Sequence, residues 1–106
     1  MSVTRQLSML SIAAKAGKVD SGGFLCEKAI AEGRAYFVII AQDASDNTKK
    51  KFLNKCSFYK VECTEYGNSA ELGRCIGKEA RTVIAITDAG LAAQVKTKLG
   101  AVEVND

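Results

Sequence analysis

Residues 71–90 read ELGRCIGKEARTVIAITDAG, a helical pattern that passes through a short basic connection into a strand pattern. Leu72 and Cys75 recur at helical spacing, and Gly77 predicts the end of that helix, because glycine readily adopts the left-handed conformation common there. The apolar run 82–87 predicts a strand that is covered on both faces. This stretch therefore indicates a sheet packed between helices.

The rest of the chain repeats this alternation. Helical spacing, glycine stops and capping residues predict helices over 4–16, 22–32, from Ser45 or Asp46 to about Cys56, 69–76 and from Thr87 or Asp88 onward. They predict extended segments over 18–21, 36–41, 61–64 and 82–87. An alternating order of this kind predicts an α/β fold, namely a three-layer α/β/α sandwich with a small mixed four-stranded sheet. The length of 106 residues predicts one domain, 1–106.

Apolar spacing also predicts the core. We expect Leu25 and Leu53 to face inward on their helices, and the aromatic residues Tyr36, Phe37, Phe52 and Phe58 to be buried. Cys26, Cys56, Cys63 and Cys75 lie among apolar neighbours without C-x-x-C spacing, so we expect them to be reduced packing residues.

Charge is distributed unevenly along the chain. Residues 1–60 hold ten lysines or arginines against five acids, whereas residues 61–106 hold five against seven. This asymmetry favours a polyanionic partner, although a solubilising surface explains it equally well. The sequence shows no signal peptide and no apolar run long enough for a bilayer, so we expect a cytoplasmic protein without a membrane partner.

A glycine pair stands in the middle of AAKAGKVDSGGFLCEKAIAEG, residues 13–33. Gly22 and Gly23 precede a predicted helix whose first N–H groups have no intrahelical partner. Lys15, Lys18 and Lys28 are close to this point in the sequence. The arrangement suits a phosphate or a base edge, and the alternative is a tight turn that simply requires glycine.

The second candidate segment is the connection Gly77–Arg81, which combines a glycine with two cations. If this connection leaves the same edge of the sheet as the glycine pair, Lys78 and Arg81 come near the glycine pair, Gly22 and Gly23, and near Lys28. The alternative is a turn with solvated charges.

The two segments together resemble the kink-turn-binding ribosomal protein superfamily, and within it the small bacterial YlxQ-type branch. The resemblance rests on AAKAGKVDSGG, EKAIAEGRAYFVIIAQDAS and ELGRCIGKEARTVIAITDAG, and it extends from about Leu7 to Leu99. It implies an α/β/α sandwich that binds sharply kinked RNA containing tandem sheared G·A pairs. The partner implied is structured RNA, either ribosomal RNA or another kink-turn RNA, with the ribosome as a possible location.

The resemblance also implies a set of RNA-binding residues. Gly22 and Gly23 match the family's glycine turn, Lys28 matches a lysine of the recognition helix, and 76–81 match the loop near the kink. The candidate RNA-binding residues are Lys15, Lys18, Ser21, Gly22, Gly23, Phe24, Leu25, Lys28, Ile76, Gly77, Lys78, Glu79, Ala80 and Arg81.

Phe24 and Leu25 depart from the family pattern, in which Asn-Glu follows the glycine turn and reads the G·A pairs. Neither side chain can hydrogen-bond a guanine edge, so we expect weaker or differently tuned binding than in ribosomal members. Exposure of the two side chains would favour a protein-interaction module of the same fold that has lost specific RNA recognition. Burial of both would favour RNA.

A second basic feature is the run Lys49–Lys51 with Lys55, which predicts either a solvated helix face or an additional phosphate contact. Evidence for catalysis is lacking, because the chain has no histidine, no phosphate-binding P-loop and no G-x-G-x-x-G turn. Asp43 and Asp46 are spaced as turn and cap residues. We therefore expect no enzyme, no catalytic residue, no metal, no cofactor and no small-molecule substrate.

Overall fold

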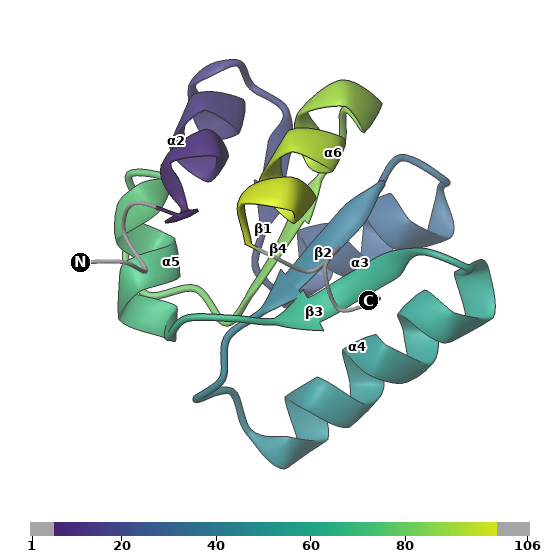
Figure 1. Cartoon of the computed structure of the whole chain (residues 1–106). Helices are drawn as coiled ribbons and strands as arrows, with labels where there is room; N and C mark the ends of the chain where they lie inside the picture. Colours follow the sequence, from purple (N-terminus) through teal and green to yellow (C-terminus); the bar gives the residue numbers. More distant parts are fainter. Residues whose placement is uncertain (1–5, 100–106) are drawn as a thin grey trace.

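The computed structural model describes residues 6–99, which form a four-stranded sheet with helices on both faces (Figure 1). The strands are β1 (Val19–Ser21), β2 (Phe37–Ile40), β3 (Glu62–Glu65) and β4 (Val83–Ile86). The helices are α2 (Ser8–Lys15), α3 (Gly23–Ala31), α4 (Asp46–Tyr59), α5 (Ser69–Cys75) and α6 (Ala89–Lys98).

The sheet has the order β1-β4-β2-β3 and contains both kinds of pairing. β4 is antiparallel to β1 and to β2, whereas β2 and β3 are parallel. Every residue of β2 and β4 is buried, because these central strands are covered on both faces. The mixed four-stranded sheet expected from the sequence is confirmed.

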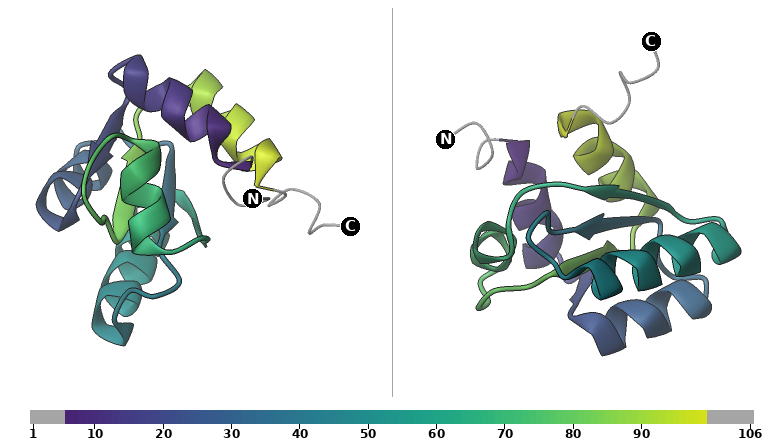
Figure 2. Two further views of the ribbon diagram at one scale, coloured as in Figure 1. Left: turned by 90° about the vertical axis from the view of Figure 1, so that its left-hand side faces the viewer. Right: turned by 90° about the horizontal axis from the view of Figure 1, so that it is seen from below.

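Two hydrophobic clusters, one on each face of the sheet, fill the space between the three layers. Phe37 and Ile39 of β2 pack with residues of α2, α5 and α6, whereas Val38 and Ile40 pack with residues of α3 and α4. Successive side chains of a strand point to opposite faces, so one strand supplies both cores. Figure 2 shows α3 and α4 together on one side of the sheet and α2, α5 and α6 on the other. The predicted α/β/α sandwich is therefore confirmed.

Helix ends follow the local signals in the sequence. Gly17, Gly33 and Gly77 have φ values of 74°, 76° and 74° and lie just beyond α2, α3 and α5, as glycine at these positions predicts. α4 extends three residues beyond the predicted end at Cys56, and Lys60 closes it in the left-handed conformation (φ 59°). The first residues of the helix predicted from Thr4 lie outside the described residues.

The prediction of the core was wrong at four positions. Leu25 and Tyr36 are 45% and 51% exposed, and Leu53 and Phe58 are 41% and 76% exposed, whereas Phe37 and Phe52 are buried as expected. Leu25 and Leu53 each lie about 100° around the helix from a buried neighbour, which is enough to reach solvent. Tyr36 precedes β2, and Phe58 lies in the part of α4 beyond the predicted end.

Candidate nucleic-acid interface

The turn into α3 is built around Gly22. Its backbone has φ 89° and ψ 159°, a combination that is almost exclusive to glycine. The Gly22 N–H donates to the Val83 carbonyl at 3.1 Å, which fixes the turn to the first residue of β4. Gly23 has no positive φ and open space where a Cβ would lie, so its role differs from that of Gly22.

No side chain caps the start of α3, and its first turn contains no acidic residue. The first N–H groups of a helix have no partner within the helix, and they carry the positive end of its dipole. The turn therefore presents backbone donors and a partial positive charge at the surface. Both favour an anionic ligand.

The α5–β4 connection, residues 76–82, folds back against α5. The Lys78 N–H donates to the Gly73 carbonyl at 2.8 Å, and the Arg81 N–H donates to the Ser69 carbonyl at 3.0 Å. A Cβ on Gly73 would lie only 1.9 Å from the Glu79 carbonyl oxygen, so the close approach requires glycine. Gly73 was not among the sequence candidates, although a glycine inside a helical pattern is a signal of close backbone packing.

Arg81 joins the connection to the Gly22 turn. Its Nε donates to the Ser21 hydroxyl at 3.1 Å, across 60 positions in the sequence. Its Nη1 donates to the Ala80 carbonyl at 3.1 Å, and the other terminal amino group of the guanidinium has no hydrogen-bond partner among residues 6–99. The structure thus brings together the two segments that the sequence analysis singled out.

A second group of candidates lines a hollow of about 320 Å³ between α2 and α5. It includes Lys15, Ile76 and Gly77, together with Arg74, which the sequence analysis did not select. The Ser11 hydroxyl donates to the Cys75 carbonyl at 2.7 Å and fixes α2 to the end of α5. The hollow therefore continues the basic surface along the start of the α5–β4 connection.

Lys18 lies apart from these groups, whereas Lys28 lies further along the helix that starts at the Gly22 turn. The Lys18 carbonyl accepts from Thr87 N at 2.8 Å, which places Lys18 at the opposite end of β1 from Gly22. Lys28 is exposed in the last turn of α3, while Lys78, Glu79 and Ala80 form the exposed tip of the connection. None of the candidate lysines, nor Arg74, forms an ion pair with another described residue.

Phe24 and Leu25 are both exposed at the first turn of α3, at 78% and 45%. Exposure is the outcome that the sequence analysis associated with a protein partner. The two side chains form an exposed apolar surface in the same helical turn as the uncapped N–H groups. A ligand at this turn therefore meets hydrogen-bond donors and an aromatic ring together.

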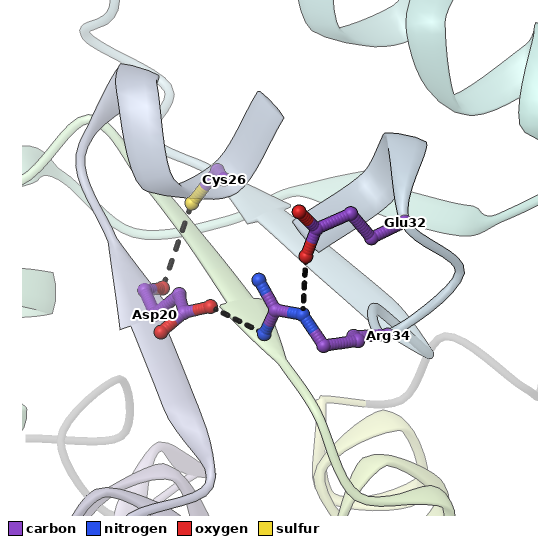
Figure 3. A network of polar contacts seen from close by, with 4 residues as sticks. All are labelled: Asp20, Cys26, Glu32 and Arg34. Atoms are coloured by element: carbon purple, nitrogen blue, oxygen red, sulfur yellow. Dashed lines mark hydrogen bonds and ion pairs between the residues drawn. The ribbon is translucent and has the colours of Figure 1, made fainter. Parts of the chain in front are cut away.

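A polar network fixes the far end of α3 to β1 (Figure 3). The Arg34 guanidinium donates to Glu32 at 2.9 Å and to Asp20 at 3.0 Å, and these contacts raise its pKa above the usual value. The Cys26 thiol contacts the Asp20 carbonyl at 3.5 Å, and burial raises its pKa to about 12. Arg34 is thus engaged by acids, and Cys26 is a neutral packing residue at physiological pH.

Two further observations concern the described residues, 6–99. They contain no group of three or more His, Cys, Asp or Glu side chains placed to hold a metal ion. None of their helices has the length and apolar character needed to cross a membrane.

Comparison with known proteins places this chain in a family. The model of the ribosomal protein L7Ae/L30e/S12e/Gadd45 family matches residues 5–96, which is most of the chain. The chain therefore belongs to the ribosomal protein L7Ae/L30e/S12e/Gadd45 family. Within it, the chain groups with the YlxQ-type proteins, as the resemblance stated above predicts.

Two relatives support that branch. The RNA-binding protein YlxQ of Bacillus subtilis (strain 168) is 47% identical over 92 residues, covering 87% of this chain and 92% of that protein. The RNA-binding protein YlxQ of Enterococcus faecium is 39% identical over 92 residues, covering 87% and 88%.

Solved structures share the fold. A Bacillus halodurans C protein of unknown function matches with a TM-score of 0.87 and 38% identity, over 91% of this chain and 97% of that one. The Giardia lamblia 15.5kD RNA binding protein matches with a TM-score of 0.80 over 98% and 90%, and at 24% identity it supports the fold alone.

Proposed function

We propose that this protein is a non-catalytic RNA-binding protein that recognises structured, kink-turn-like RNA. It acts as one RNA-binding domain over residues 1–106, in the cytoplasm and in association with the ribosome or with translation. The observation that carries the proposal is the uncapped start of α3, fixed through Arg81 to the basic α5–β4 connection. The names of the two YlxQ relatives support RNA as the ligand.

Each part of this surface has a distinct role in the proposal. The first N–H groups of α3 bind a phosphate or a base edge, and Lys28 contacts the backbone further along the same helix. Arg81 directs its fork towards the RNA while its Nε holds Ser21 in place. Residues 76–80 and Lys15 contact the other side of the kink. Most of the affinity comes from phosphates and most of the selectivity from the bent shape of the RNA.

The exposed Phe24 and Leu25 define how this surface differs from an Asn-Glu site. They offer contact with a base plane or a ribose, but no hydrogen bond to the edge of a guanine. Recognition then rests on shape and backbone, as is common for folded RNA. The affinity for a kink-turn is accordingly lower than that of members that read the G·A pairs directly.

A binding titration tests the proposal. The probe is a kink-turn hairpin, and the control is the same hairpin with Watson–Crick pairs in place of its G·A pairs. We expect a clear preference for the kinked hairpin. The titration is made at about 0.15 M salt, because affinities for nucleic acids are meaningful only at a stated ionic strength. Equal binding to both hairpins would contradict kink recognition while leaving general RNA binding in place.

Substitutions then locate the site. Arg81→Ala and Lys28→Ala are each expected to weaken binding about tenfold and to flatten its salt dependence. Arg81→Lys keeps the charge but loses the planar fork, so it should recover only part of the affinity. Lys98→Ala, which removes an exposed cation near the end of α6, is the matched control and should bind as the wild type. Unchanged binding in both site variants would exclude this surface.

The exposure of Phe24 and Leu25 supports a second candidate function, a protein-interaction module with the same fold. Under this alternative, the wild type binds neither hairpin. Phe24→Ala would then leave RNA titrations at background and reduce association with a protein partner.

A further inference from the structure

The end of α4 carries an exposed aromatic pair that the proposed interface does not use. Phe58 is 76% exposed and Tyr59 is 42% exposed. Their ring centroids are 4.9 Å apart at 81°, an edge-to-face arrangement that leaves Phe58 largely in solvent. An exposed aromatic pair of this kind is unusual on a helix whose inner face is already filled by Phe52 and Cys56.

The segment of α4 that leads to this pair is rich in lysines. Residues 49–60 contain five lysines and no aspartate or glutamate. Lys49 and Lys51 pair with Glu65 and Glu27, whereas Lys50, Lys55 and Lys60 form no ion pair within residues 6–99. Lys55 Nζ lies 5.7 Å from the Tyr59 ring centroid, which places a cation beside the aromatic surface.

This α4-end surface, defined by Lys55, Phe58, Tyr59 and Lys60, is separate from the Gly22 turn. β3 begins just after this surface, at Glu62, which pairs with Phe37 of β2. Phe37 pairs in turn with Ile86, the last residue of β4, so the α4-end surface lies near the end of the sheet where β4 finishes. The α5–β4 connection enters the sheet at Val83, the other end of β4. Figure 1 shows α4 running away from that connection towards the end of the sheet where β3 begins.

We propose that the α4-end surface binds unpaired nucleotides of RNA, with a base stacked on Phe58 and phosphates held by Lys55 and Lys60. A base has an apolar face and an attached anion, and this surface offers an exposed aromatic ring at the same helix end as Lys55 and Lys60, which form no ion pair within residues 6–99. Lys50, Lys55 and Lys60 form no ion pair within residues 6–99, and cations left unpaired in this way favour a polyanionic partner. The inference rests on the proposed function in taking RNA as the ligand, but it concerns a different face of the molecule.

The test compares two probes on one set of variants. The probes are a single-stranded oligouridylate of about twelve nucleotides, within the site sizes usual for single-strand binding, and a kink-turn hairpin without single-stranded tails. Phe58→Ala should weaken oligouridylate binding roughly five- to fiftyfold, in line with the loss of one stacked base, and change hairpin affinity less than twofold. Thermal unfolding should be nearly unchanged, because Phe58 is exposed.

Two further variants sharpen this test. Leu53→Ala truncates another exposed apolar side chain of α4, and it should bind both probes as the wild type. Lys60→Gln should reduce the slope of log K against log salt for the oligouridylate by about 0.7, the value expected for one phosphate contact on a single strand.

The outcomes distinguish the two proposals. Hairpin binding without any oligouridylate binding would overturn this inference and leave the proposed function in place. Oligouridylate binding that Phe58→Ala weakens, without hairpin binding, would support this inference and contradict kink recognition. Equal oligouridylate binding by wild type and Phe58→Ala would overturn the inference. So would a change in self-association by sedimentation without a change in RNA binding, which would identify a contact between copies of the chain.

Discussion

Within residues 6–99, four helices begin after a strand, and one of them begins differently from the other three. α4, α5 and α6 start at Ser45, Asn68 and Asp88, whose side chains accept from backbone N–H groups at 3.1, 2.9 and 2.9 Å. α3 starts at Gly22, which has no side chain to accept. Three helix starts are thus satisfied by the protein itself, and one is left with free donors at the surface.

The capped starts stabilise their helices, whereas the uncapped start of α3 keeps its N–H groups available for a ligand. A capping side chain stabilises a helix by about 1 kcal/mol relative to alanine but by only about a few tenths of a kcal/mol relative to glycine, so the Gly22 start forgoes a small part of the stability that the other three starts retain. Gly22 offsets part of that loss through its bond to Val83, which fixes the turn in place. Under the proposed function, the start of α3 serves a ligand, whereas the starts of α4, α5 and α6 serve the fold.

The largest expected effect comes from Gly73, which supports the connection beside the open helix start. Gly73→Ala places a Cβ 1.9 Å from the Glu79 carbonyl and displaces the connection. We expect a loss of about 3 kcal/mol in the free energy of unfolding, measured by urea denaturation, because a backbone atom cannot rotate away. A loss below 0.5 kcal/mol would show that residues 76–82 do not need this close packing.

Gly22→Ala tests the conformation of the open start itself. The φ of 89° with ψ 159° disfavours any side chain, so we expect about 2 kcal/mol of destabilisation and weaker RNA binding. Gly23→Ala is the matched control, since its Cβ meets open space and its φ is not positive. It should retain or slightly raise the unfolding temperature, and a loss equal to that of Gly22→Ala would contradict the geometry of the turn.

Asp88→Ala tests a helix start that is capped by a side chain. It removes the acceptor for Leu91 N and should destabilise the protein by about 1 kcal/mol, measured by thermal or urea unfolding. RNA affinity should stay within twofold of the wild type, because α6 begins at the opposite end of β4 from the Gly22 turn. A tenfold loss of RNA binding in a folded Asp88→Ala protein would contradict the claim that the capped helix starts contribute to stability and not to RNA binding.

The smallest effect concerns Asp43, which gives α5 a second acceptor at its start. The Asp43 carboxylate accepts from Ser69 N at 2.8 Å and from the Ser69 hydroxyl at 2.9 Å, and these bonds lower its pKa. Because the pKa is lower in the folded state, the stabilisation is present above about pH 4 and is lost as pH falls through the folded pKa. Wild type should therefore exceed Asp43→Asn in stability at pH 7, and the difference should shrink below pH 4. A difference that grows in acid would contradict this assignment.

The parts of this fold that could be predicted from the sequence are those governed by local rules. The glycine stops after α2 and α5 depend on backbone conformation within a few residues, so the sequence identifies them. For α6 the sequence leaves Thr87 or Asp88 as the cap, and the structure shows that Asp88 caps the helix. The continuous apolar runs of β2 and β4 predict central strands, because only central strands bury both faces.

The misplaced residues depend on tertiary contacts that the sequence does not display. Phe58 is exposed because α4 continues past Cys56, and a residue two positions further on lies about 200° around the helix from that buried side chain. Lys18 lies far from the Gly22 turn because β1 carries it to the other end of β4. Gly73 matters because the α5–β4 connection packs directly against α5 at this residue. Arg74 lines the hollow because α2 packs beside α5. Both contacts join segments that are distant from each other or turn back in the fold, so the sequence does not show them.

The most direct test of the central claim is a ¹⁵N-correlation NMR titration of the protein with a kink-turn hairpin. The claim is that RNA binds at the uncapped start of α3, where the N–H groups of Gly23, Phe24 and Leu25 have no side-chain acceptor. We predict that these amides and that of Arg81 show the largest shift changes, while the capped amides Thr48 and Leu91 stay in place. Large changes at the capped starts, with Gly23 and Phe24 unmoved, would contradict the account.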